Sequence, residues 1–122
     1  MFSPEERIAL ARASIGDRVD GCRVVVEGFS GLLVQYARAR RARAIVRGLR
    51  AVTDFESESQ MTLMNRYLEP EVETVFLMTS LRNAYLSSSL IKEVVRGGGD
   101  VSGLVPPAVA EALMQRSASP RP

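Results

Sequence analysis

The sequence predicts an α/β fold in which helices cover a parallel sheet. Apolar segments of strand length alternate with segments of helical length, an order that requires crossover connections. The strands are continuous apolar runs such as Val24-Val25-Val26, which is typical of strands covered on both faces. Capping and helix-breaking residues mark most boundaries between these segments.

Helix caps place the first half of the chain. Ser3-Pro4-Glu5-Glu6 is a capping box with proline at the first helical position, and we expect its helix to reach about Ser14. The inward side chains of this helix are predicted to be Ile8, Ala9, Leu10 and Ala13. Residues 22–26 are predicted to form a strand, and residues 30–41 a helix whose inward face holds Leu32, Leu33 and Tyr36.

The second half repeats this alternation. Strands are expected at residues 44–46 and 73–78, and the helix between them runs from the capping box Thr53-Asp54-Phe55-Glu56 to Leu68, before Pro70. Met61 and Met64 in this helix are interpreted as core residues. An irregular loop at residues 79–86 leads to a helix at 87–96 closed by three glycines, and Pro106-Pro107 starts a last helix that ends near Arg116.

Length and composition predict one domain, residues 1–116, with a disordered tail at residues 117–122. The 122 residues are 46% hydrophobic and 25% charged, which is ordinary for a globular protein. A net charge of +2 is too small to indicate a nucleic-acid or membrane partner, and no segment is apolar and long enough to span a bilayer. The lone Cys22 excludes a disulfide framework within this chain and indicates a cytoplasmic location.

Two short motifs indicate binding of an oxyanion. Arg47-Gly48-Leu49-Arg50 follows an apolar strand, where a bend can aim two guanidinium groups at one phosphate-sized charge. The serines at 87–89 open a predicted helix, where free N–H groups and the helix dipole favour anions. The alternatives are surface arginines and an ordinary serine cap. The arginine run at residues 38–43 is interpreted as a solvated helix end.

Several segments match one family in their order along the chain. They are Phe2-Ser3-Pro4-Glu5-Glu6-Arg7, residues 46–56, Met64-Asn65-Arg66, Val75-Phe76-Leu77-Met78 and residues 87–93. Together they resemble bacterial phosphopantetheine adenylyltransferases over residues 2–115. The resemblance implies a doubly wound, Rossmann-like nucleotidyltransferase fold. It also implies a reaction of coenzyme A synthesis, in which the phosphate of 4′-phosphopantetheine attacks the α-phosphate of ATP.

The resemblance assigns residues to both substrates. Arg47 would bind the phosphate of 4′-phosphopantetheine, while Leu33 and Asn65 would face its pantetheine arm. ATP would be bound by Gly48, Leu49, Arg50, Glu58, Asn83, Ala84, Tyr85, Leu86, Ser87, Ser88 and Ser89. Mg²⁺ is expected on the triphosphate, although no carboxylate cluster resembles a dedicated metal site. A homo-oligomer, a hexamer in the family, is also implied.

The chain also departs from the family pattern. The family's Thr-x-Gly-His motif has no counterpart and the chain contains no histidine, so no catalytic residue is expected in it. The sheet order of the family is 3-2-1-4-5, and two missing strands would lie between strands 22–26 and 44–46. Two interpretations stay open. One is an adenylyltransferase without its N-terminal part, inactive as a 122-residue chain; the other is a catalytically inactive remnant that keeps an oligomerisation or ligand-binding surface.

Overall fold

The computed structural model describes residues 1–118, with the side chains of all of these except Arg18, Val52, Thr53, Leu81 and Ala118. The last part of the predicted tail, residues 119–122, lies outside the described residues. The chain divides into two compact units. One unit is Phe29–Tyr85, and the other combines Met1–Gly28 with the described part of Leu86–Pro122.

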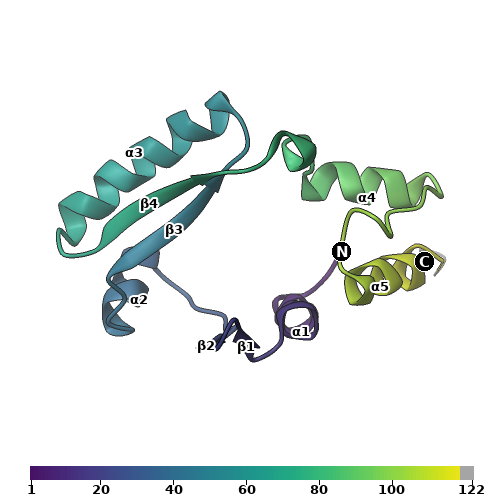
Figure 1. Cartoon of the computed structure of the whole chain (residues 1–122), viewed down its shortest axis with the longest axis horizontal. Helices are drawn as coiled ribbons and strands as arrows, with labels where there is room; N and C mark the ends of the chain where they lie inside the picture. The colour runs from purple at the N-terminus through teal and green to yellow at the C-terminus, as the bar shows by residue number, and fades with distance from the viewer. Residues whose placement is uncertain (119–122) are drawn as a thin grey trace. The chain divides into compact units, whose positions relative to one another are not determined.

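The unit Phe29–Tyr85 is built around a parallel pair of strands. Its elements are α2 (Leu33–Ala39), β3 (Ala44–Leu49), α3 (Val52–Leu68), β4 (Glu73–Met78) and a short 3-10 helix, η1 (Leu81–Asn83). β3 and β4 pair in parallel from Ala44 opposite Glu73 to Leu49 opposite Met78. α3 lies alongside the two strands that it connects (Figure 1). This β-α-β unit confirms the predicted parallel pairing, and β4 has its predicted bounds.

A small apolar core joins α2 to β3 in this unit. Val34 and Ala37 of α2 pack with Ile45 of β3 and with Val72, which precedes β4. α2 is shorter than the predicted helix at residues 30–41, and Leu32 is its exposed N-cap residue and not part of an inward face. Beyond its C-terminal end the chain turns at Arg41, which has a φ of 54°, a conformation that a helix cannot continue.

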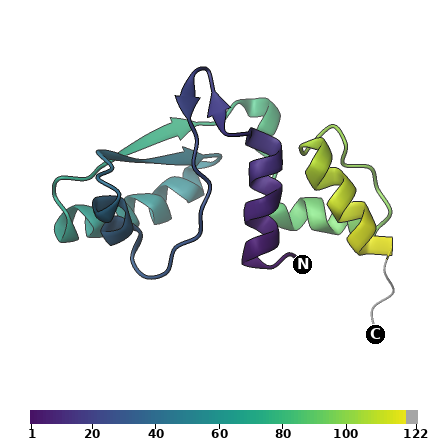
Figure 2. The ribbon, with the colours of Figure 1, turned by 90° about the horizontal axis from the view of Figure 1, so that it is seen from below.

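The other unit contains three helices and a hairpin. Its elements are α1 (Pro4–Ile15), β1 (Arg18–Val19), β2 (Cys22–Arg23), α4 (Ser88–Arg96) and α5 (Pro107–Ala118). α5 contacts both α1 and α4 (Figure 2). A core of Ile91, Val95, Val101 and Leu113 joins α4 to α5. The predicted capping box of α1 is present, but no residue of α1 is buried. Of its predicted inward side chains Ile8 and Leu10 are half-buried, whereas Ala9 and Ala13 are exposed, so the prediction is wrong for the two alanines.

The predicted strand at residues 22–26 is wrong in length and in partner. β2 is only two residues long and pairs antiparallel with β1, with Val19 opposite Cys22. Asp20 and Gly21 connect them with φ values of 48° and 83°, and a two-residue turn of type I′ requires positive φ at both positions. The Asp-Gly pair therefore directs the chain into a hairpin before the valines at 24–26.

Candidate functional site

β3 continues three residues beyond its predicted end, so the predicted bend at Arg47-Gly48-Leu49-Arg50 is wrong. Arg47, Gly48 and Leu49 are strand residues opposite Phe76, Leu77 and Met78 of β4. The ladder continues past the strand, because the Thr79 N–H donates to the Leu49 carbonyl oxygen at 2.9 Å. Pairing with β4 thus overrides the turn preference of Gly48. The chain leaves the sheet only at Arg50.

Arg47 forms a two-contact ion pair with Glu58 of α3. Its Nε donates to Glu58 Oε2 at 2.7 Å, and its Nη2 donates to Glu58 Oε1. This hydrogen bonding raises the pKa of Arg47 and lowers the pKa of Glu58, so both groups stay charged. Phe76, the cross-strand neighbour of Arg47, meets Phe55 of α3 edge to face at 5.9 Å between ring centroids. Arg47 therefore lies on the side of the sheet that faces α3.

Arg50 pairs with Asp54 in the first turn of the same helix. Asp54 Oδ2 accepts a hydrogen bond from the Arg50 backbone N–H at 3.2 Å and lies 3.3 Å from Arg50 Nε. α3 begins at Val52 with Ala51 as its N-cap, so Thr53 lies inside the first turn and the predicted capping box is wrong. The side chain of Thr53 is outside the described residues. A carboxylate in the first turn interacts favourably with the helix dipole. The Asp54 carboxylate also binds the backbone of Arg50, in the connection between β3 and α3.

α3 turns its polar side chains inward. Asp54, Glu58, Thr62 and Asn65 recur at helical spacing and are half-buried or buried, and Asn65 is only 8% exposed. The large apolar side chains of the helix are exposed instead: Phe55, Met61, Leu63, Met64, Tyr67 and Leu68. The interpretation of Met61 and Met64 as core residues is therefore wrong for the described chain. The inner side of α3 is suited to a polar ligand, and its outer side to an apolar surface.

The serine motif forms a helix start in the other unit. Ser87 is the N-cap of α4, and its Oγ accepts a hydrogen bond from the Leu90 N–H at 3.1 Å. Ser88 and Ser89 are exposed in the first turn. The cap interpretation of Ser87 is therefore confirmed. The predicted ATP-binding residues are divided between the two units, so each part is described by itself.

Comparison with known proteins places the sequence in a family. A family model described as cytidylyltransferase-like matches residues 1–94. The chain is 50% identical over 117 residues to a phosphopantetheine adenylyltransferase from Solidesulfovibrio magneticus, with coverage of 95% of this chain and 66% of the relative. Two further enzymes of that name, from Alkaliphilus oremlandii and Alkaliphilus metalliredigens, are 52% and 53% identical over 95% and 96% of the chain and 72% and 73% of their own lengths.

The chain belongs to the phosphopantetheine adenylyltransferase family. It spans about two thirds of the first of these relatives, at 66%, and 72% and 73% of the other two. The predicted family resemblance and the nucleotidyltransferase fold class are confirmed.

The remaining predicted site residues lie at the start of α2 and in the segment from η1 to the start of α4. Leu33 begins α2 and packs against the core of Val34 and Ala37. Asn83 ends η1, and its N–H donates to the Ser80 carbonyl oxygen at 3.0 Å. Ala84 and Leu86 are half-buried, while Tyr85 is exposed. Leu33, Asn83, Ala84 and Tyr85 belong to the same unit as Arg47, but within the described part of that unit no hydrogen bond or ion pair joins them to Arg47.

Sequence reasoning missed the acidic partners of the two arginines. Asp54 belongs to the predicted capping box, but it also stands four residues after Arg50 and four before Glu58. That spacing puts both carboxylates on one side of a helix that follows the arginines directly. The same pattern could have indicated the Arg47–Glu58 pair.

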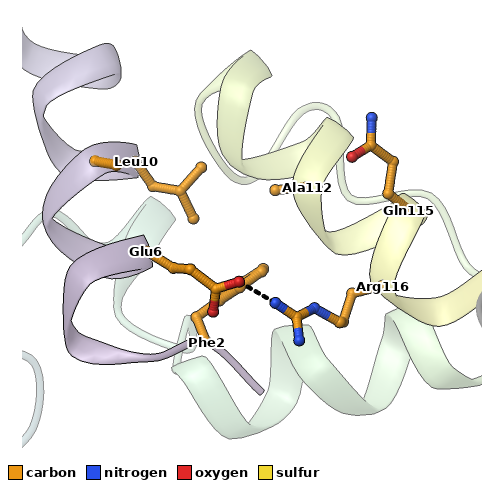
Figure 3. A pocket seen from close by; sticks show the side chains of 7 residues that line it. Phe2, Glu6, Leu10, Ala112, Gln115 and Arg116 are labelled. Carbon is orange, nitrogen blue, oxygen red and sulfur yellow. Dashed lines mark hydrogen bonds and ion pairs between the residues drawn. The ribbon is translucent and has the colours of Figure 1, made fainter. Parts of the chain in front are cut away.

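A separate pocket of about 380 Å³ lies between α1 and α5 (Figure 3). Phe2, Leu10 and Ala112 line it, and an ion pair between Glu6 and Arg116 crosses its end. None of the predicted site residues lines this pocket. Within residues 1–118, as far as side chains are described, no group of three or more histidine, cysteine or acidic residues is placed to hold a metal ion. In the same part of the chain, no helix is long and apolar enough to cross a membrane.

Proposed function

We propose that this protein transfers the adenylyl group of ATP to 4′-phosphopantetheine. A phosphate oxygen of 4′-phosphopantetheine attacks the α-phosphorus of ATP, the bond to the β-phosphate breaks, and dephospho-coenzyme A and pyrophosphate form. The observation that carries the proposal is the pair of arginines at the carboxyl end of β3, in a chain about 50% identical to phosphopantetheine adenylyltransferases. That similarity favours the enzyme over an inactive remnant.

Arg47 is assigned to the phosphate of 4′-phosphopantetheine, and Leu33 and Asn65 to its pantetheine arm. Asn65 supports this assignment, because its amide is largely buried and has no hydrogen-bond partner among the described residues. An amide in that state gains by pairing with an amide of the ligand. ATP is assigned to Gly48, Leu49, Arg50 and Glu58, and to residues 83–89. Transfer between phosphates depends mainly on positioning and charge neutralisation, which these groups can supply.

Mg²⁺ is proposed to accompany ATP. The described chain offers no cluster of acidic side chains for a dedicated metal site, so the triphosphate and water would supply most ligands. We also propose a cytoplasmic location, which the exposed free thiol of Cys22 supports, because such thiols persist in reducing compartments.

A homo-oligomer, a hexamer as the family resemblance implies, is the proposed assembly. The outward face of α3 supports it, since Leu63 is 68% and Tyr67 83% exposed. Large exposed apolar patches of this kind mark interaction surfaces.

Arginine substitutions test the substrate assignment. Arg47→Ala is expected to weaken 4′-phosphopantetheine binding about ten- to a hundredfold, because hydrogen bonds to charged groups are lost. Arg50→Ala is expected to weaken mainly ATP binding. Isothermal titration calorimetry with each substrate measures both effects, and Arg38→Ala, which removes an ion pair with Glu69 elsewhere in this unit, is the control. Equal effects of both site variants on both substrates would contradict the assignment.

A further inference from the structure

We propose that Glu58 is a positioning residue that orients the Arg47 guanidinium toward the substrate phosphate. The proposal rests on the proposed function, which assigns that phosphate to Arg47. Its observation is the two-contact pair in which Glu58 binds Arg47 Nε and Nη2. Two parallel hydrogen bonds fix the plane of a guanidinium, whereas a single contact leaves it free to turn.

Glu58 uses only some of the N–H groups of Arg47, so one edge of the guanidinium remains available to a ligand. A guanidinium has five N–H groups. Glu58 takes one on Nε and one on Nη2, and among the described residues no other group accepts from Arg47. The two N–H groups of Nη1 and the second one of Nη2 therefore remain. One N–H of Nη1 and the remaining N–H of Nη2 are parallel and form a second forked edge, which can bind two phosphate oxygens while Glu58 stays in place.

Both partners stand on regular elements, so the orientation is set by the fold. Arg47 lies within β3, and Glu58 lies one helical turn after Asp54 in α3. The Glu58 side chain is 20% exposed and the Arg47 side chain 43%. Glu58, the residue proposed to orient Arg47, is therefore the less exposed of the two. The Arg50–Asp54 contact is different, because Arg50 lies outside the strand and its Nε is 3.3 Å from the carboxylate.

A competing role for Glu58 would have the opposite effect. If the carboxylate occupied the position that the phosphate needs, its removal would strengthen phosphate binding. The geometry favours orientation, because Glu58 uses the Nε edge of Arg47 and leaves the Nη1 edge to a ligand.

A double-mutant cycle tests the proposal on the full chain. Binding of 4′-phosphopantetheine is measured by calorimetry for the parent, Glu58→Gln, Arg47→Ala and the double variant. Glu58→Gln is expected to weaken binding about tenfold, within the range of coupling between paired residues, and to have no further effect in the Arg47→Ala background. Glu58→Asp, which keeps the charge, is expected to restore part of the loss. Glu69→Gln breaks the Arg38–Glu69 pair, at 2.7 Å the matched control, and should leave binding unchanged.

The outcomes separate a failure of the positioning role of Glu58 from a failure of the assignment of the substrate phosphate to Arg47. Weakening by Arg47→Ala but not by Glu58→Gln, or tighter binding of Glu58→Gln, overturns the positioning role alone. An equal effect of Glu58→Gln with and without Arg47 shows a general structural role and also overturns it. If Arg47→Ala itself leaves binding unchanged, the assignment of the phosphate fails, and the positioning role fails with it. Should Glu58→Gln not fold, the comparison of Glu58→Asp with and without Arg47→Ala applies the same criteria.

Discussion

At the level of one residue, the fold does not require glycine at position 48, whereas binding of a ligand close to the backbone would. Its φ is not in the left-handed region, and a Cβ built on it would meet no atom within 4 Å. The fold therefore has room for a side chain at this strand position. Glycine within a strand is costly by about 0.5–1 kcal/mol relative to alanine. A close approach of ligand to the backbone is a physical reason to retain it.

Gly48→Ala is expected to leave the free energy of unfolding unchanged or to raise it by about 0.5 kcal/mol, since it reduces the freedom of the unfolded chain. The same change is expected to weaken ATP binding, because the added methyl group occupies space beside the proposed triphosphate. Urea denaturation and calorimetry measure the two effects. Gly103→Ala is the control, because it too would meet nothing within 4 Å. ATP binding of Gly48→Ala equal to that of the parent would argue against the triphosphate assignment.

At the level of elements, boundaries set by neighbouring residues could be predicted from the sequence, whereas boundaries set by pairing with a distant strand could not. The capping box of α1, the Ser87 cap of α4 and the bounds of β4 follow from side chains within a few residues, and all were predictable. β3 was predicted too short because its last three residues owe their conformation to β4, which lies far along the sequence. The site was affected in the same way. The two arginines could be found from sequence, but their carboxylate partners depend on how α3 packs on β3.

Ser87→Ala is expected to lower the free energy of unfolding by about 1 kcal/mol, because the Leu90 N–H loses its acceptor. Ser88→Ala is the matched control, since Ser88 is exposed within the first turn and does not cap the helix. We expect Ser88→Ala to change stability by less than about 0.5 kcal/mol. Chemical denaturation followed by circular dichroism measures the difference. Equal stabilities of the two variants would show that the cap contributes nothing to α4.

At the level of the whole molecule, α3 relates the binding site to assembly. Its inner side carries the carboxylates that hold Arg47 and Arg50, and its outer side carries exposed apolar side chains. A partner that covers the outer side would restrict the motion of the same helix. The proposed oligomer would then help to order the proposed site.

Leu63→Lys is expected to disrupt the oligomer, because it places a charge in the centre of a surface that a second copy would bury. Sedimentation velocity measures the mass of parent and variant at equal concentrations. Gln35→Lys adds the same charge at an exposed polar position of α2, outside the outer face of α3, and should leave the mass unchanged. A parent that sediments as a monomer, or a Leu63→Lys variant that assembles like the parent, would contradict the proposed interface.

The ion pair between β3 and α3 also limits where residues can be inserted or deleted in this chain. α3 has 17 residues and rises about 26 Å, enough to return along the whole of a six-residue strand of about 20 Å. One residue inserted early in α3 would rotate everything after it by roughly 100° about the helix axis. Glu58 and Asn65 would then leave the inner side together. Natural insertions and deletions are therefore expected around residues 69–72 and 79–86, where a connection can absorb them, and not within the helix.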